Sequence, residues 1–123
     1  MVAQLEIPAS TALRAMELGR EAGATTVLNA APAQPLPSDR LHAVDVLTPN
    51  AVELRTLLGV KAAPDVPEVE LCRSALELGV RSVVLTRGQR GVLVVEADRK
   101  YEVPALKVDA VDTTGAGDAF TAV

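Results

Sequence analysis

Near the end of the sequence, Thr113-Thr114-Gly115-Ala116-Gly117-Asp118-Ala119-Phe120 leads from a small-residue turn directly into a predicted helix. Such a turn presents several unpaired backbone amides, and the N-terminus of the helix adds partial positive charge. Glycine lets an anion approach the backbone closely. We therefore expect Gly115, Ala116 and Gly117 to form an anion hole. Asp118 falls in the first helical turn, where it can accept a proton from an attacking hydroxyl, so the stretch predicts phosphoryl transfer.

Two other glycine-rich nucleotide-binding motifs do not fit this stretch. The third glycine of the dinucleotide pattern G-x-G-x-x-G is missing, and the chain has no G-x-x-x-x-G-K-[ST] phosphate loop. A simpler alternative is that Gly115 and Gly117 belong to an ordinary loop and that Asp118 is a favourable first-turn acid. A bare G-x-G-D would favour that alternative, so the rest of the sequence has to decide.

Outward from this stretch, strand and helix signals alternate along the chain. β-branched and apolar runs indicate strands, helical spacing of apolar residues indicates helices, and glycine and proline mark their ends. Asn50 is expected to cap one helix and Asp65 with Glu68 to form a capping box before another. The expected elements are strands at 2–5, 25–28, 45–48 and 82–86, helices at 12–22, 37–44, 51–58 and 69–76, and a hairpin of strands at 91–96 and 100–103.

This alternation predicts the α/β class, with a mainly parallel sheet flanked by helices. Hydrophobic residues make up 49% of the chain and aromatic residues only 2%, so the core has to consist of alanine, valine and leucine, as is typical of helices packed on a parallel sheet. Ligands of such folds bind at the carboxyl ends of the strands. Asn29, Asn50 and Thr86 all follow predicted strands, so we expect them at one site.

The longer string Asp112-Thr113-Thr114-Gly115-Ala116-Gly117-Asp118-Ala119-Phe120 resembles the C-terminal signature of the ribokinase-like (PfkB) carbohydrate kinases. Further stretches agree with that family in order along the whole chain. They are Gln4-Leu5-Glu6, Asn29-Ala30-Ala31-Pro32-Ala33, Thr48-Pro49-Asn50 with Glu53, Thr86-Arg87-Gly88-Gln89-Arg90-Gly91, and Val108-Asp109-Ala110-Val111.

The resemblance implies a three-layer sandwich of the Rossmann type and an ATP-dependent kinase that phosphorylates the primary hydroxyl of a small sugar. In that comparison Asp118 is the catalytic base and contacts the substrate, while the anion hole holds the transferring phosphoryl group. Asp112 and the carbonyl of Thr114 match ligands of a monovalent cation, usually K⁺. Asp112 is equally explained as a turn residue whose side chain bonds the following backbone.

The resemblance also assigns the nucleotide side of the site. Asn50 matches a residue that approaches the nucleotide phosphates, and Glu53 matches one that organises Mg²⁺ through water; a capping box alone would explain both residues. Thr86, Gly88 and Gly91 match a turn that borders ATP, although a plain hairpin turn explains the glycines as well. Arg87 and Arg90 are further candidates for contact with phosphate.

On the sugar side, Glu6 matches an acidic residue that contacts sugar hydroxyls, whereas its simpler interpretation is an exposed loop acid. Together with the Asn29 loop it favours D-ribose over fructose, ketodeoxygluconate or a nucleoside as the substrate. The usual Asn-Pro-Ala-Pro of ribokinases is Asn29-Ala30-Ala31-Pro32 here. We interpret His42 as an exposed side chain and Cys72 as a core residue.

Composition excludes several other classes of function. A formal net charge of −4 with scattered lysines and arginines gives no footprint for nucleic acid, and no apolar stretch is long enough to cross a membrane. One cysteine excludes an internal disulfide. We therefore expect a cytoplasmic protein. The resemblance implies sugar and ATP as its partners and leaves a homodimer of the complete protein open.

The family's chains are considerably longer than 123 residues. We therefore expect residues 1–123 to be a partial kinase domain, incomplete at both ends and inactive alone. The rival interpretation is a catalytically inactive remnant or binding module.

Overall fold

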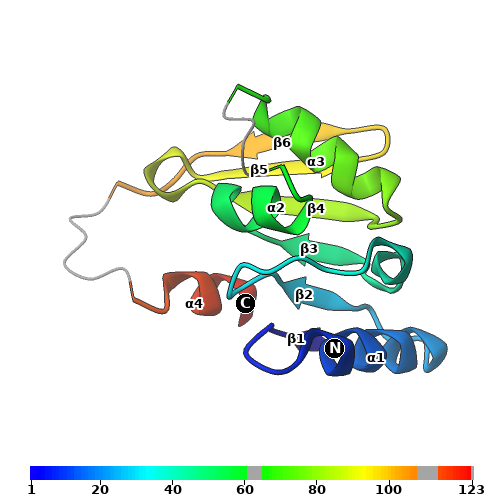
Figure 1. The fold of residues 1–123 in the computed structure, drawn as a ribbon. Coiled ribbons are helices and arrows are strands. Elements are labelled where there is room, and N and C mark those ends of the chain that lie inside the picture. The colour runs from blue at the N-terminus through cyan, green and yellow to red at the C-terminus, as the bar shows by residue number, and fades with distance from the viewer. Residues whose placement is uncertain (61–64, 108–113, 123) are drawn as a thin grey trace.

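The computed structural model describes residues 1–60, 65–107 and 114–122, which form one six-stranded sheet with helices packed on it (Figure 1). The strands follow one another across the sheet in chain order, β1-β2-β3-β4-β5-β6. β1 to β4 are parallel to their neighbours, whereas β5 runs antiparallel to both β4 and β6. The strands are β1 (Val2–Ala3), β2 (Val27–Asn29), β3 (Val46–Thr48), β4 (Ser82–Thr86), β5 (Val92–Glu96) and β6 (Lys100–Val103).

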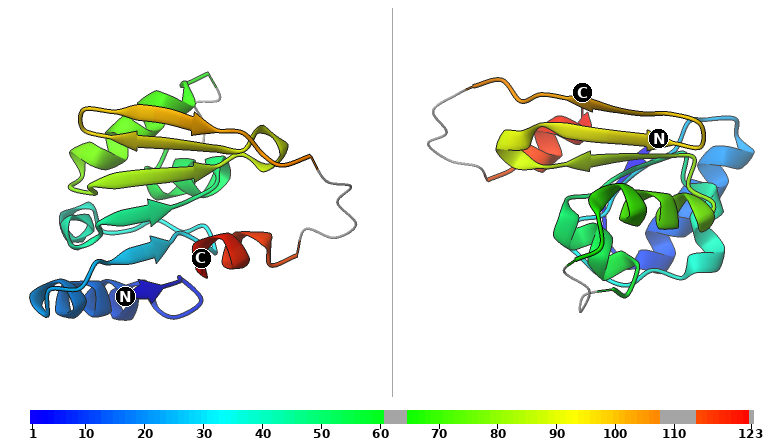
Figure 2. Two further views of the ribbon diagram at one scale, coloured as in Figure 1. Left: turned by 180° about the vertical axis from the view of Figure 1, so that it is seen from behind. Right: turned by 90° about the horizontal axis from the view of Figure 1, so that it is seen from above.

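The helices on the sheet connect its parallel strands, as the alternating pattern predicts. Seen from above in Figure 2, the blue to green helices lie together on one side of the sheet, whereas the red helix α4 lies apart from them. In the same figure α4 lies beside the carboxyl end of β2. The helices are α1 (Ala9–Glu21), η1 (Ser38–Ala43, a 3₁₀ helix), α2 (Ala51–Leu57), α3 (Glu68–Glu77), η2 (Gly88–Arg90, also 3₁₀) and α4 (Ala116–Ala122).

The core lies between the sheet and the helical layer of α1, α2 and α3. Alternate strand residues point to that side and are fully buried, with Leu28, Leu47 and Val83 as examples from neighbouring strands. The helices contribute leucines and Met16, and aromatic residues are absent from this core, as the composition requires. Cys72 is buried there as predicted, and burial raises the pKa of its thiol to about 11.

Most of the predicted elements are confirmed, but the structure corrects several details. The strand predicted at 2–5 ends at Ala3. Glu68 is the first residue of α3, and Pro67 precedes it at the N-cap without a side-chain cap, so the predicted Asp65–Glu68 capping box is wrong. The carboxylate of Glu68 pairs with two arginines instead. The strand predicted from residue 25 begins only at Val27, and the amide of Thr26 before it donates to the side chain of Asp45.

Thr26 and Asp45 precede β2 and β3 and fasten the amino ends of these strands together. The backbone amide of Thr26 donates to Oδ2 of Asp45 at 2.9 Å, and the amide of Asp45 donates to Oγ1 of Thr26 at 2.9 Å. Arg81 lies 3.3 Å from the other carboxylate oxygen. The Thr26 amide, helped by the Thr26 hydroxyl and Arg81, holds the pKa of Asp45 below its ordinary value.

We predict that Asp45→Asn destabilises the fold by about 1–3 kcal/mol near neutral pH, because a charge-assisted hydrogen bond and an ion pair are lost. A carboxylate with a lowered pKa stabilises the fold above its unfolded pKa, and this stabilisation disappears as the pH falls through the folded pKa. The gap in unfolding midpoint between wild type and Asp45→Asn should therefore shrink below about pH 4. Urea unfolding of the complete gene product between pH 3 and 7 measures it.

The matched control is Asp98→Asn, which changes an exposed carboxylate in the turn between β5 and β6. Its unfolding midpoint should follow that of the wild type across the pH range. A gap between wild type and Asp45→Asn that stays constant from pH 7 to pH 3 would contradict the role given to the Asp45 charge.

Candidate active site

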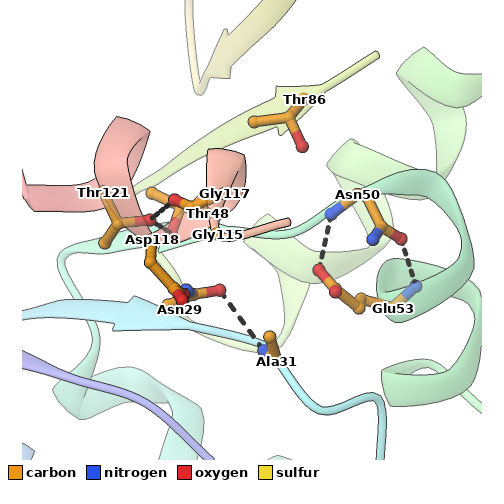
Figure 3. A pocket seen from close by; sticks show the side chains of 10 residues that line it. All are labelled: Asn29, Ala31, Thr48, Asn50, Glu53, Thr86, Gly115, Gly117, Asp118 and Thr121. Carbon is orange, nitrogen blue, oxygen red and sulfur yellow. Dashed lines mark hydrogen bonds between the residues drawn. The ribbon is translucent and has the colours of Figure 1, made fainter. Parts of the chain in front are cut away.

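The carboxyl ends of β2, β3 and β4 meet at one edge of the sheet and line a cavity of about 230 Å³. Asn29 and Thr86 are the last residues of β2 and β4, and Asn50 follows β3 by two residues. The predicted meeting of these three side chains is therefore confirmed. Figure 3 shows the cavity, which is lined by Asn29, Ala31, Thr48, Asn50, Glu53, Thr86, Gly115, Gly117, Asp118 and Thr121.

Asn50 and Glu53 form the predicted capping box at the start of α2. Oδ1 of Asn50 accepts from the amide of Glu53 at 2.9 Å, and Oε2 of Glu53 accepts from the Asn50 amide at 2.8 Å (Figure 3). Oδ1 of Asn50 also accepts from the amide of Val52 at 2.9 Å. Both side chains also line the cavity. Capping thus fixes their positions at its wall, and the two interpretations of this pair are compatible.

Thr86 joins the ends of β3 and β4 through Pro49. Its amide donates to the Pro49 carbonyl at 2.9 Å, and its hydroxyl lies 3.3 Å from the same oxygen. Asn50 and Thr86 also form a parallel bridge beyond the end of the regular ladder. This bridge holds the start of α2 beside the end of β4, where both contribute to one wall of the cavity.

The turn after Thr86 depends on two glycines with positive φ. Gly88 has φ +56° and opens η2, and Gly91 has φ +81° and ends it. The turn is closed by hydrogen bonds from Gly91 to the Gly88 carbonyl at 2.9 Å and from Arg87 to the Gly91 carbonyl at 2.8 Å. Neither glycine lines the cavity that Thr86 faces, so the turn borders the site from outside it.

Arg87 and Arg90 point away from the cavity and pair with carboxylates. The side chain of Arg87 is only 8% exposed and lies 2.7 Å from Glu102 on β6 and 3.7 Å from Glu68 on α3. Arg90 pairs with the same Glu68 at 2.5 Å. These ion pairs connect the turn to α3 and β6. Neither arginine lines the cavity, although both were candidates for contact with phosphate.

Asp118 reaches the cavity from α4 and is held by two amide side chains. Its Oδ1 accepts from Nε2 of Gln4 at 2.7 Å and from Nδ2 of Asn29 at 3.4 Å. Sequence reasoning gave Gln4 no role of its own. The predicted strand at 2–5 contained Gln4, whereas in the structure β1 ends at Ala3 and Gln4 comes directly after it, where side chains that follow parallel strands converge.

The hydroxyl of Thr121 connects α4 to the sheet. It donates to the Gly117 carbonyl at 2.9 Å and lies 3.2 Å from the hydroxyl of Thr48, at the end of β3. Since a hydroxyl donates only once, Thr48 is the donor in that second contact. Neither threonine was predicted as part of the site, because each was expected only as an element residue.

The turn before α4 is open toward the cavity. Gly115 has φ +73°, and a β-carbon added at Gly115 or Gly117 would meet no atom within 4 Å. Gly115 and Gly117 line the cavity, and Ala116 lies between them at the start of α4. The backbone of the predicted anion hole is therefore accessible beside Asp118.

Asp118 also lines a second hollow, of about 600 Å³. Glu6, Gln4 and Ile7 line it together with Asp118 and Thr121. Asp118 and Thr121 thus belong to the walls of both hollows. Glu6 therefore shares a hollow with Asp118, although it does not line the first cavity.

Only one of the two predicted cation ligands lies in the part of the chain that the structure describes. Thr114 lies within the described part of the chain, whereas Asp112 and residues 108–111 lie outside it. Where the chain is described, no three His, Cys, Asp or Glu side chains gather into a group that could hold a metal ion. In the same described part, no helix is both long and apolar enough to cross a membrane. Glu53 and Asp118 are the two carboxylates among the described residues that line the cavity.

Comparison with known proteins identifies the class. A sequence profile described as "pfkB family carbohydrate kinase" matches residues 2–123, so the chain belongs to the pfkB family of carbohydrate kinases. It is 37% identical to a ribokinase of Staphylococcus aureus over 120 residues, covering 98% of this chain and 40% of that protein. It is 36% identical to a deoxyribokinase of Salmonella typhi over 121 residues, with the same two coverages of 98% and 40%.

Solved structures agree with the fold. A ribokinase of Thermotoga maritima superposes with a TM-score of 0.85 at 34% identity, over 97% of this chain and 39% of that one. Arabidopsis thaliana ribokinase complexed with ribose and ATP gives 0.85 at 28% identity, over 98% and 40%. The chain therefore spans about two fifths of the length of these four relatives.

The two glycines of the turn after Thr86 should respond differently to a side chain. We predict that Gly88→Ala costs about 1 kcal/mol of stability. The added β-carbon would contact no other atom, but the alanine would have to adopt the left-handed backbone conformation of Gly88. Gly91→Ala should cost several times more, because its β-carbon would collide with the backbone of Val103 and Pro104. Urea unfolding of both variants measures the difference, and equal midpoints would contradict the close approach at Gly91.

Proposed function

We propose that the complete gene product that contains this chain is an ATP-dependent kinase that phosphorylates the primary hydroxyl of a small sugar, D-ribose. One observation carries this proposal: Asp118 lines two hollows, one of which is also lined by the glycines of the turn and the other by Glu6. Phosphoryl transfer requires a base next to a group that stabilises the anion. The similarity to ribokinases, one of them solved with ribose and ATP, supports the same reaction.

In the proposed reaction Asp118 accepts the proton of the sugar hydroxyl while the oxygen of that hydroxyl bonds to the γ-phosphorus of ATP. The bond from that phosphorus to the oxygen bridging to ADP breaks, and the electron pair leaves with ADP. The amides of Gly115, Ala116 and Gly117 would stabilise the charge on the transferring group. The open space at Gly115 and Gly117 supports this assignment, since a side chain there would keep the phosphate from the backbone.

The first cavity would receive the nucleotide phosphates. Asn50 and Thr86 line it, and Gly88 and Gly91 shape the turn that borders it. Asn50 offers its Nδ2 as a donor, because its Oδ1 already accepts from α2. We assign these four residues to contact with ATP.

Glu53 fits a role at Mg²⁺ held through water. Its Oε2 is engaged by the Asn50 amide, and among the described residues it does not belong to a group of three or more His, Cys, Asp or Glu side chains that could enclose a metal ion. Mg²⁺ keeps several waters and is commonly held by one or two carboxylates together with phosphates. When bound, the ion would neutralise charge on the phosphates during transfer. Asp112 and Thr114 are proposed ligands of K⁺, on the resemblance alone.

Glu6 would accept hydrogen bonds from sugar hydroxyls in the second hollow, opposite the phosphates. Ribose is favoured by the relatives named ribokinase, and 2-deoxyribose is a further candidate because another relative is named deoxyribokinase. Fructose, ketodeoxygluconate and nucleosides remain alternatives, as does a catalytically inactive fragment. A cytoplasmic location and a homodimer stay predictions.

We predict that Asp118→Asn lowers single-turnover phosphorylation of ribose at least 100-fold, because the proton acceptor is lost. ATP binding should persist, since the glycine turn is unchanged. Single-turnover formation of the sugar phosphate and nucleotide titration of the complete gene product measure the two effects. Asp98→Asn, an exposed acid in the β5–β6 turn, should leave both unchanged.

Two outcomes would contradict this assignment. A rate for Asp118→Asn within about tenfold of wild type, a barrier change near 1.4 kcal/mol, would remove Asp118 as the base. If the complete gene product transfers phosphate to none of ribose, 2-deoxyribose, fructose, ketodeoxygluconate or nucleosides, the proposed function itself fails.

We predict further that K⁺ raises the activity of the complete gene product and that Asp112→Ala abolishes this response. Asp112 would supply one of the few charged ligands of the ion, and the remaining oxygens would bind it too weakly. Activity is titrated with KCl at constant ionic strength, with Asp98→Ala as the control. An unchanged potassium response in Asp112→Ala would remove Asp112 from the cation site.

A further inference from the structure

The side chains of Gln4 and Asn29 both donate to the same oxygen of Asp118. The Nε2 atom of Gln4 lies 2.7 Å from Oδ1, and the Nδ2 atom of Asn29 lies 3.4 Å from it. Gln4 is 114 residues away from Asp118 in the sequence, and Asn29 is 89 residues away from it. Nothing in the signature around Asp118 requires them, so they are a separate property of how this chain folds.

The orientation of the Asn29 carboxamide is determined by its neighbours. Asn29 is 3% exposed, and its Oδ1 accepts from the amide of Ala31 at 3.3 Å (Figure 3). A backbone amide can only donate, so the opposite end of the side chain, Nδ2, has to face Asp118. The donor is thereby fixed on the end of β2.

The orientation of Gln4 follows from the charge of its partner. An ionised carboxylate only accepts, so the atom of Gln4 that faces Asp118 must be its NH₂ group. The contact of 2.7 Å is in the range of a charge-assisted hydrogen bond, which is stronger than one between neutral groups. Gln4 follows β1, so the two donors approach from the ends of two neighbouring parallel strands.

Among the described residues, both donors bond Oδ1 and none bonds Oδ2 of Asp118. Two donors on one oxygen restrict the rotation of the carboxylate, although Asp118 is exposed and belongs to a helix of seven residues. The other oxygen is left available for a proton. We infer that Gln4 and Asn29 form an amide clamp that positions Asp118, presenting Oδ2 to the reacting hydroxyl. This inference rests on the proposed function of Asp118 as the base.

The sharpest test is Gln4→Met in the complete gene product, because methionine has similar length but no donor. We expect kcat to fall about 10- to 100-fold, the size of effect that a misplaced reacting group produces, while KM for ATP stays within about threefold. The matched control is Gln34→Met. Gln34 is also partly buried and donates to a backbone carbonyl, that of Leu5, without contact to Asp118. It should keep wild-type kinetics.

A double-mutant cycle separates positioning from a general structural role. If Gln4 acts through Asp118, Gln4→Met should lower kcat no further in a chain that already carries Asp118→Asn. A second full loss in that background would show that Gln4 acts independently of Asp118 and would overturn the inference. Equal kinetics for Gln4→Met and wild type would overturn it as well.

The contacts themselves can be tested without activity. In ¹⁵N spectra of the complete gene product, the side-chain NH₂ resonances of Gln4 and Asn29 should shift on Asp118→Ala, whereas that of Gln34 should not. If these resonances shift but no sugar is phosphorylated, the clamp is real and the proposed function is wrong. If the protein is an active kinase and the resonances do not move, the clamp is absent.

Discussion

The hydrogen bond from the Thr86 amide to the Pro49 carbonyl is the contact on which the candidate site depends. This bond of 2.9 Å extends the pairing of β3 and β4 beyond their regular ladder. It thereby holds the segment between β3 and α2 beside the end of β4. Asn50 and Glu53 at the start of α2 consequently face the same cavity as Thr86 and the glycine turn of α4. Without this contact the capping box would form equally well, but it would not be a wall of the site.

The features that could be predicted from the sequence are those with short-range causes. The capping box of Asn50 and Glu53 involves residues three apart, and the strand-helix alternation follows from local spacing of apolar residues. The convergence of Asn29, Asn50 and Thr86 could also be predicted, because the carboxyl ends of parallel strands meet at one edge whatever the details of packing. Local pattern and general topology therefore predicted the position of the site.

The features that could not be predicted depend on partners far away in the chain. Arg87 looks like an exposed arginine beside a glycine turn, yet its side chain is largely buried and pairs with Glu68 and Glu102. The Asp65–Glu68 pattern fits a capping box, but Glu68 pairs with Arg87 and Arg90, and Pro67 occupies the N-cap position. In both cases a tertiary ion pair, absent from any local pattern, decided where a charged side chain went.

The order of the strands also has a consequence for how the protein folds. Each strand pairs with the strand that precedes it in the chain, so the sheet can grow in the direction of synthesis, one neighbour at a time. The contact between Gln4 and Asp118 is different, because it closes a loop of 114 residues. Closing such a long loop carries an entropic cost that is offset only after the sheet exists. We therefore expect Asp118 to reach its place last, after the ribosome has delivered a sheet that is already paired.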